Sequence, residues 1–372
     1  MDNLLLWIMA GRMSEQYEVH VNSSQFSYFI GTDFEKLNLS GKRNVLIVDR
    51  NVRERCLELF PDQDFYIELV INEEEKSLDS VKNILTSLAE FGITRGDQII
   101  AVGGGALQDL VTLSASIYMR GIDWHFVPTT LMSMLDSCIG GKSSINLGEY
   151  KNLIGNFYPP KMILIDPEFL TTLNSIDIAS GLAEGVKICF AAGKDTASKF
   201  KNLSNEWKSS ESSDSILEAI FLCLHSKKWF VEVDEFDKKE RKLLNFGHSF
   251  GHALESASGF AIPHGVGVFI GMYSAILRSN QVDSCKDLSN YIESETKAIT
   301  GLIPKFQFDA EVFLDALKRD KKNSELQQLL ILPDESGRLI EATFEISSAN
   351  LEICLNSLTT ALSKLGFEYE VL

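Results

Sequence analysis

Residues 98–109 read QIIAVGGGALQD, and this stretch decides the fold class of the first part of the chain. The apolar run over 98–102 predicts a short buried strand, and a helical run begins near Ala106. The three glycines between them would let a ligand approach the backbone, and the free N–H groups of the following helix would face a pyrophosphate. A tight turn without a ligand explains the glycines equally well, because the stretch lacks the G-x-G-x-x-G fingerprint.

The segments around this strand repeat the alternation of strand and helix. Between Val81 and Phe91 the apolar residues recur at helical spacing, which predicts a crossover helix before residues 98–102. Such alternation is typical of an α/β domain with a mostly parallel sheet. Further strands are predicted from the β-rich runs at 17–21, 44–49, 65–71, 124–130 and 162–166.

The chain changes character after about Leu173. Helical patterns then follow one another, and the β signals fade. We therefore expect a nucleotide-binding α/β domain over residues 1–173 and an all-α domain over residues 174–372, packed closely with a cleft between them. A length of 372 residues suits two domains that each bury a core of their own.

The charge and the cysteines of the chain limit its partners and its compartment. A net charge of −17 and a pI near 4.9 oppose binding to nucleic acid or to an anionic membrane surface. The six cysteines are scattered without a C-x-x-C pair, which argues against disulfides and a thiolate zinc site and favours the reducing cytoplasm. The opening MDNLLLWIMAGRM is too short to span a bilayer and has Asp2 where a signal peptide has basic residues. Residues 1–13 are therefore expected to be an extension before a second possible start at Met13.

Three of the six histidines lie within residues 248–264, in NFGHSFGH and PHG. His248 and His252 are four residues apart, so on a helix both imidazoles would project from one face. His264 and an acid in the helical GLAEGVK, Glu184, complete a candidate set. Two imidazoles and a carboxylate leave open positions on a divalent ion, which suits catalysis better than a structural role. A satisfied core histidine is the better interpretation of each residue alone, but the set favours a metal site.

Further charged residues lie where a ligand could use them. Asp49 ends the strand over 44–49, where an acid could bind a ribose hydroxyl or cap the next helix, with equal weight. Several basic residues lie in glycine- and asparagine-containing loops, in apolar or tightly turned contexts such as YMRG and GGKSS. Long basic side chains there are expected to pair with an anion that carries phosphate and a carboxylate. This basic set comprises Arg120, Lys142, Lys151, Lys187, Lys227 and Arg241.

Seven motifs stand in the order in which dehydroquinate synthases have them. They are GGGALQD, YMRG, PTTLMSMLDS, GGKSSIN, KNLIGNF, GLAEGVK and LNFGHSFGHALE. The chain therefore resembles the 3-dehydroquinate synthase family from about Tyr17 to at least Ala275, with a weaker DKKN echo at 320–323.

The resemblance implies a two-domain fold with NAD in the cleft and a divalent metal, usually zinc, with cobalt as the alternative. The metal ligands would be Glu184, His248 and His264, and His252 would face the substrate instead of the ion. Arg120 resembles a residue that reaches the phosphate in a neighbouring subunit's site, so a homodimer is implied. NAD would contact Asp49, Glu73, Lys76, Gly104, Gly105, Asp109, Thr129, Thr130, Lys151 and Thr172. The substrate would contact Asp136, Lys142, Asn152, Lys187, Lys227, Arg241, Asn245 and His252, with one of Lys321 or Lys322.

The activity that the resemblance implies is the cyclisation of 3-deoxy-D-arabino-heptulosonate 7-phosphate to 3-dehydroquinate, a lyase reaction of the shikimate pathway. NAD would take a hydride from the substrate and return it within each turnover. The phosphate would be held by Lys142, Asn152, Asn245 and His252. The hydroxyl groups near the metal would be oriented by Lys187 and Asp136, and a carboxylate would be clamped by Lys227 and Arg241.

Three positions depart from the family's pattern. The third ligand is followed by HGVGV where the family usually has HGEAV, so Val266 replaces an acid. Asn72 replaces a glycine before residue 73, and Ala106 replaces a valine after the glycines. A carboxylate beside a metal-bound histidine can tune that ligand, so Val266 indicates a divergent enzyme. The retained pair Lys227 and Arg241 argues for the usual carboxylate substrate.

Three rival interpretations stay open beside the family's main activity. A divergent cyclase would act on sedoheptulose 7-phosphate, an amino analogue or a hexose phosphate. A polyol dehydrogenase of similar fold would accumulate NADH, although the phosphate-type residues Lys142, Asn152 and Arg120 speak against it. A non-catalytic homologue would bind a partner and neither metal nor NAD.

Overall fold

The computed structural model describes residues 17–37, 39, 41–61, 63–72, 74–148, 150–319 and 327–372. The chain divides into two compact units, one of residues 1–173 and 213–235, the other of residues 174–212 and 236–372. Helix α7 (Ser213–Val233) is thus part of the first unit, whereas the boundary expected from the sequence places it in the second domain. The extension predicted for residues 1–13 lies outside the described residues.

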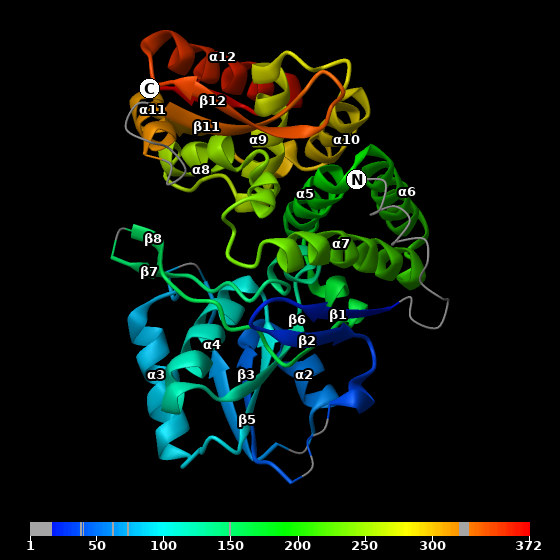
Figure 1. The fold of residues 1–372 in the computed structure, drawn as a ribbon, viewed down its shortest axis with the longest axis vertical. Helices are drawn as coiled ribbons and strands as arrows, with labels where there is room; N and C mark the ends of the chain where they lie inside the picture. The colour runs from blue at the N-terminus through cyan, green and yellow to red at the C-terminus, as the bar shows by residue number, and fades with distance from the viewer. Residues whose placement is uncertain are drawn as a thin grey trace. The chain divides into compact units, whose positions relative to one another are not determined.

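A seven-stranded sheet forms the centre of the first unit (Figure 1). Its strand order is β1-β2-β9-β6-β5-β3-β4, and only the pair β1–β2 is antiparallel. The prediction of a mostly parallel sheet is therefore confirmed. The strands are β1 (Glu18–Asn22), β2 (Ser27–Gly31), β3 (Asn44–Asp49), β4 (Phe65–Leu69), β5 (Gln98–Gly103), β6 (Asp123–Pro128) and β9 (Met162–Leu164).

Burial explains the composition of the central strands. Every residue of β5 is buried, and so is every residue of β3 except the last, because helices cover the parallel sheet. The predicted crossover helix is confirmed as α3 (Leu78–Glu90), which Ser77 caps and which buries Val81, Ile84 and Leu88. Helices α3 and α4 (Gly105–Ile117) lie side by side, and α2 (Arg53–Leu59) contacts β3 (Figure 1).

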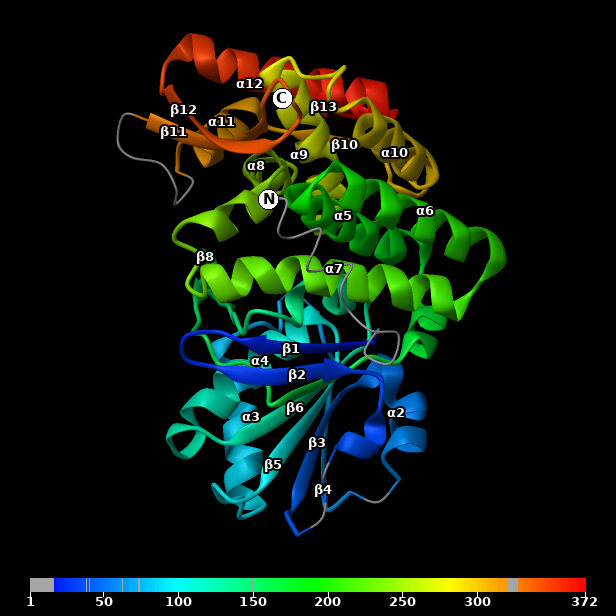
Figure 2. The ribbon, with the colours of Figure 1, turned by 45° about the vertical axis from the view of Figure 1, so that its right-hand side comes forward.

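Helix α7 runs along β1 (Figure 2). Tyr17 and Phe221 meet edge to face, with ring centroids 5.5 Å apart, which ties α7 to the start of β1. The first unit is completed by β7 (Ile145–Leu147) and β8 (Tyr150–Ile154), which form a separate hairpin. Its short turns are η2 (Phe34–Lys36), η3 (Arg50–Val52), η4 (Tyr118–Arg120), the π-helical η5 (Ser133–Ser137) and η6 (Pro167–Thr172).

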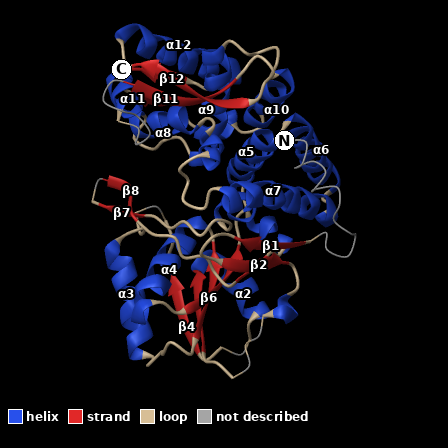
Figure 3. Cartoon of the chain, in the orientation of Figure 1, coloured by secondary structure: helices blue, strands red, loops and turns tan. Residues whose placement is uncertain are grey.

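The second unit is mainly helical, as Figure 3 shows in blue. The predicted helical character is confirmed, with two small sheets that the sequence reading left out: β10 pairs with β13, and β11 pairs with β12. Strands β10 and β13 have three residues each, which is too short for an alternating pattern to appear. Their bounds are β10 (Phe306–Phe308), β11 (Gln327–Pro333), β12 (Leu339–Glu345) and β13 (Tyr369–Val371).

Glycines allow the helices of the second unit to pack very closely. A Cβ on Gly271 would lie 2.0 Å from the carbonyl oxygen of Gly247, and one on Gly265 would lie 2.3 Å from the Cα of Ser180. Helix α9 therefore approaches both α8 and α5 at backbone contact distance. The elements are α5 (Ser175–Ala192), α6 (Lys194–Ser210), η7 (Glu240–Asn245), α8 (His248–Ala257), α9 (His264–Ser279), α10 (Lys286–Lys297), η8 (Thr300–Leu302), α11 (Ala310–Lys318) and α12 (Ser348–Leu365). Among the described residues, no helix is both long and apolar enough to cross a membrane.

Candidate functional site

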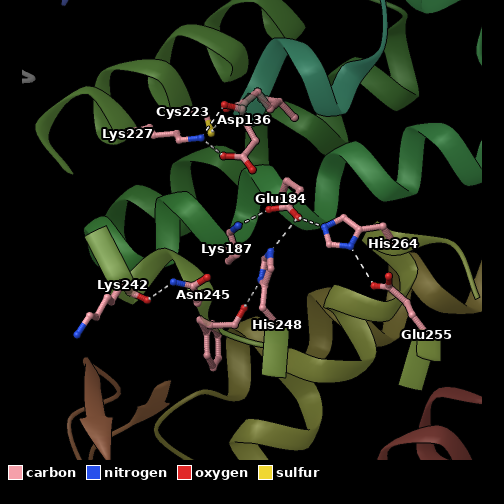
Figure 4. A network of polar contacts seen from close by, with 12 residues as sticks. Asp136, Glu184, Lys187, Cys223, Lys227, Lys242, Asn245, His248, Glu255 and His264 are labelled. Carbon is pink, nitrogen blue, oxygen red and sulfur yellow. Dashed lines mark hydrogen bonds and ion pairs between the residues drawn. The ribbon is translucent and has the colours of Figure 1, made fainter. Parts of the chain in front are cut away.

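Three helices of the second unit bring the predicted metal ligands together (Figure 4). Glu184 lies within α5 and is only 1% exposed. His248 is the first residue of α8, and His264 is the first residue of α9. Because α9 packs against both α5 and α8, the two imidazoles at the helix starts meet the buried carboxylate.

The distances between the three side chains suit a divalent ion. The Oε1 atom of Glu184 lies 3.2 Å from Nε2 of His264 and 3.6 Å from Nε2 of His248. Ligands about 2.0–2.2 Å from a tetrahedral zinc ion are separated by about 3.3–3.6 Å, so these atoms are spaced as ligands of one ion would be. Three protein ligands leave the fourth position open for a substrate oxygen.

His252 belongs to the same cluster. One ring nitrogen from each of His248, His252 and His264 lies within 4.8 Å of the others, so these three histidines could also hold an ion. The ring of His252 is stacked on that of His264 at 5.3 Å between centroids, and the residue is exposed. Both possible ligand sets contain His248 and His264.

The charges around Glu184 favour a cation at this place. Burial raises the pKa of Glu184, but the ion pair with Lys187 and the hydrogen bond with His264 outweigh it, so the net shift is downward. Burial lowers the pKa of His264, but its hydrogen bonds to Glu184 and Glu255 raise it to about 10. A group held between two carboxylates in this way marks a position where positive charge is stabilised.

Glu255 is a site residue that the sequence reading missed. It lies near the end of α8, and its Oε1 atom is 2.9 Å from Nδ1 of His264 (Figure 4). Residues 248, 252 and 255 follow the spacing i, i+4, i+7, which places them on one face of a helix. This spacing is the signal that could have added Glu255 to the set.

Other predicted residues of the second unit lie near this cluster in the chain. Lys187 is buried beside Glu184 on the next turn of α5, as Figure 4 shows. Arg241 and Asn245 belong to the turn η7, directly before α8. Arg241 is buried, and the side-chain amide of Asn245 donates to the carbonyl oxygen of Lys242 over 3.0 Å.

In the first unit the predicted nucleotide residues gather at one edge of the sheet. Asp49, Gly103 and Thr129 stand at the carboxyl ends of the neighbouring parallel strands β3, β5 and β6, and the N–H of Thr129 donates to the carbonyl oxygen of Gly103 over 3.0 Å. A Cβ on Gly104 would lie 3.0 Å from Cγ2 of Thr130, so the glycine turn and the threonine pair are in contact. The carboxyl edge of such a sheet is where nucleotides bind in open α/β folds.

The side chain of Asp49 accepts a hydrogen bond from the N–H of Asn51, so it caps the turn η3. The capping role that the sequence left open is thus present. Burial raises the pKa of this carboxyl.

Residues that are expected to bind NAD and residues that are expected to bind phosphate contact one another in a polar cluster of the first unit. The Nζ atom of Lys76 is 2.9 Å from Oδ2 of Asp109 and 2.9 Å from Oδ1 of Asn152. The N–H of Ser144 donates to Asp109 over 3.1 Å. Lys76 is buried, and the side chains are tied into one network within the first unit.

Asp136 and Lys227 form a second pair in the first unit (Figure 4). The ammonium of Lys227 contacts the carboxylate of Asp136 and also donates to its carbonyl oxygen over 2.7 Å. Asp136 lies in the π-helical turn η5, a rare conformation that often occurs at functional sites. The two residues predicted to contact substrate therefore contact each other.

Thr172 and three basic residues of the first unit were also predicted to contact ligands. Thr172 donates its hydroxyl to the carbonyl oxygen of Phe169 over 2.7 Å, within the turn η6. Lys142, Lys151 and Arg120 are exposed, and Arg120 has a left-handed backbone with φ of 67°. The predicted residues Glu73, Lys321 and Lys322, and the DKKN echo, lie outside the described residues.

The fold, with an α/β unit and a helical unit, is shared with solved structures of synthases and of an iron-containing alcohol dehydrogenase. The fold is similar to that of 2-deoxy-scyllo-inosose synthase in complex with carbaglucose-6-phosphate, NAD+ and Co2+, with a TM-score of 0.77 and 21% identity over 91% of this chain and 99% of that one. It is also similar to 2-epi-5-epi-valiolone synthase from Streptomyces hygroscopicus with NAD+ and Zn2+ bound, with a TM-score of 0.74 and 23% identity over 91% and 98% of the two chains.

Comparison of the sequence with known families identifies the family of the chain. The model of the 3-dehydroquinate synthase N-terminal domain matches residues 66–180, and that of the C-terminal domain matches residues 181–323. The 3-dehydroquinate synthase of Clostridium acetobutylicum is 35% identical over 320 residues, which is 82% of this chain and 86% of that protein. The same enzyme of Methylacidiphilum infernorum is 41% identical over 256 residues, 67% and 68% of the two chains. The chain belongs to the 3-dehydroquinate synthase family.

Proposed function

We propose that this protein converts 3-deoxy-D-arabino-heptulosonate 7-phosphate into 3-dehydroquinate with elimination of phosphate. The family membership supports this activity, and the convergence of Glu184, His248 and His264 is the observation that carries it. A buried carboxylate with two imidazoles at ligand spacing is the type of site that a lyase of this kind needs.

We propose Glu184, His248 and His264 as the metal ligands, with zinc as the metal and cobalt as the alternative. We prefer the set with Glu184 to the set of three histidines for two reasons. The Oε1 atom of Glu184 lies at ligand spacing from Nε2 of His248 and of His264, and His252 is exposed. When bound, the metal would polarise a substrate hydroxyl, and NAD would accept and return one hydride.

The chain's own residues would bind and orient the substrate. Lys187, beside Glu184, would hold a hydroxyl group near the metal, and Asp136 would orient another. The buried Arg241 and Lys227 would clamp the carboxylate, so Lys227 would exchange its present contact with Asp136 for the substrate. The phosphate would be held by Lys142, Asn152, Asn245 and His252, with one of Lys321 or Lys322 nearby.

The NAD contacts are proposed from the sheet edge and its surroundings. The first turn of α4 offers N–H groups to a pyrophosphate. Gly104 and Gly105 lie against Thr130 and Ser137 at this turn, because a Cβ on either glycine would lie 3.0 Å or 3.3 Å from those side chains. The full proposed set is Asp49, Glu73, Lys76, Gly104, Gly105, Asp109, Thr129, Thr130, Lys151 and Thr172. Binding of NAD should raise the melting temperature, because a ligand at a hundred times its Kd adds about 2.7 kcal/mol to stability.

A panel of sugar phosphates tests the proposed substrate. With NAD and zinc present, we expect phosphate release from 3-deoxy-D-arabino-heptulosonate 7-phosphate but not from sedoheptulose 7-phosphate or glucose 6-phosphate. Arg241→Ala should abolish this preference because it removes the carboxylate clamp, whereas Lys297→Ala, at an exposed position of α10, serves as the control. Phosphate release from the other sugars alone would establish a divergent cyclase, the alternative that Val266 favours.

We further propose that the enzyme works as a cytoplasmic homodimer in which Arg120 reaches the phosphate bound by the second copy. Light scattering should then give about twice the chain mass of 41.5 kDa. A monomeric mass for the active enzyme would contradict this proposal.

A further inference from the structure

Two residues after His264, the third proposed metal ligand, this chain has a valine where the family usually has a glutamate. Val266 follows His264 by two residues on α9, and its side chain is fully buried. An acid therefore cannot act on His264 from this position. The structure shows a carboxylate that reaches the same imidazole from another helix.

That carboxylate belongs to Glu255 at the end of α8. Its Oε1 atom lies 2.9 Å from Nδ1 of His264, while Nε2 of the same ring lies 3.2 Å from Oε1 of Glu184. The two ring nitrogens thus have separate partners. A neutral imidazole that donates its Nδ1 proton to Glu255 directs the lone pair of Nε2 towards the metal position.

Gly267 provides the space for this carboxylate. A Cβ at residue 267 would lie 3.2 Å from Oε1 and 3.5 Å from Cγ of Glu255. The first distance is tighter than an ordinary van der Waals contact, so an alanine here would press on the carboxylate that contacts His264. The family's HGEAV pattern has a glutamate and an alanine where this chain has Val266 and Gly267.

We propose that Glu255 is a positioning residue, which fixes the ring orientation and tautomer of His264 from α8, and that Gly267 makes room for it. Helix α8 then supplies the metal ligand His248 at its first residue. Near its end it supplies Glu255, the hydrogen-bond partner of the ligand His264. The inference rests on the proposed metal site but not on the identity of the substrate.

The test compares zinc affinity in Glu255→Ala, Glu255→Gln and Gly267→Ala, measured by competition with a chromophoric chelator. Loss of an outer partner of a metal-bound histidine weakens metal binding by about 10–100-fold, and we expect this loss in Glu255→Ala. Glu255→Gln keeps an oxygen that can accept from Nδ1, so it should restore most of the affinity. Gly267→Ala should fall between Glu255→Ala and the wild type. Glu352→Ala, at an exposed position of α12, is the matched control and should bind zinc as the wild type does.

A second readout separates positioning from a general loss of stability. Nitrogen-15 NMR of the zinc-loaded protein should show the Nδ1 proton of His264 protected from exchange with water in the wild type and in Glu255→Gln, and rapid exchange of this proton in Glu255→Ala, because Glu255 accepts from Nδ1. Unchanged zinc affinity and an unchanged exchange rate of the Nδ1 proton in Glu255→Ala would overturn the proposal, and so would a wild-type protein that does not bind zinc. Wild-type protein that binds zinc but releases no phosphate from any sugar phosphate would overturn only the proposed function.

Discussion

His264 is the residue on which two carboxylates converge, and the proposed metal binding would be coupled to its protonation. Without an ion its pKa is about 10 against an ordinary value of 6.5, although burial alone would lower it, because Glu184 and Glu255 accept from its ring. The stability that this group contributes to the metal-free protein is therefore fully present below pH 6.5 and is lost as the pH rises through about 10.

In the proposed site zinc would bind the neutral imidazole of His264, so zinc binding would displace this proton. We expect the zinc affinity to increase with pH up to about 10, with about one proton released per ion near neutral pH. Calorimetry in buffers of different ionisation enthalpy measures that number. An affinity independent of pH would show that His264 is not a ligand.

The residues of the metal cluster could be predicted from sequence to a limited extent. The spacing of His248 and His252 indicated a common helix face, but spacing alone could not tell a ligand from a residue beside the ion. Glu255 was missed because its role depends on α9, which brings His264 to the end of α8. The spacing of residues 248, 252 and 255 places Glu255 on the same helix face as the two histidines, but it does not show that His264 lies beside it.

At the scale of elements, the contact between α8 and α9 sets the geometry of the metal cluster. Gly271→Ala would place a Cβ 2.0 Å from the carbonyl oxygen of Gly247, so the two helices would have to separate. We expect a loss of about 3 kcal/mol in the free energy of unfolding, at the upper end of typical overpacking, together with weaker zinc binding.

Chemical denaturation and zinc competition measure both effects. Gly301→Ala is the matched control, because no atom lies within 4 Å of a Cβ at that position. A Gly271→Ala protein with wild-type stability would show that the two helices do not need this close approach.

Asp97, directly before β5, has a buried carboxylate that forms an ion pair with Arg43. Asp97 accepts from the guanidinium of Arg43 and from the N–H of Thr94, and the guanidinium, as the largest influence, lowers the pKa of Asp97 to about 2. Because the folded value lies below the ordinary 3.8, this stability is present above pH 3.8 and is lost as the pH falls through about 2.

Replacement of Asp97 should remove its contribution to the pH dependence of the free energy of unfolding. Asp97→Asn is expected to lose about 2 kcal/mol of unfolding free energy at neutral pH, with less difference from the wild type at pH 2. Denaturation at the two pH values measures this. An equal loss of unfolding free energy at both pH values would mean that packing, and not the ion pair, causes the loss.

Elements with strong apolar runs were predicted well, and irregular ones were not. The buried strands β3 and β5 and the helix α3 follow directly from their patterns. The strand β2 was missed, and its place between β1 and β9 depends on pairing with distant segments. The π-helical turn that carries Asp136 has no sequence pattern of its own.

At the scale of the whole molecule, the assignment of α7 shows the limit of a boundary drawn from composition. Its helical pattern resembles that of the following helices, but its contacts are with β1 and with the turn η5. Lys227 on α7 reaches Asp136 for this reason. Lys227 thus follows the predicted boundary in chain order, and the compact unit that contains it is the first.

The central claim concerns the reaction, and one assay tests it most directly. Phosphate and NADH are followed together while the zinc-loaded enzyme turns over 3-deoxy-D-arabino-heptulosonate 7-phosphate with catalytic NAD. We predict phosphate in equal amount to the substrate consumed, 3-dehydroquinate as the product and no accumulation of NADH, because the hydride returns within each turnover. Accumulation of NADH without phosphate, or no phosphate release at all, would contradict the account.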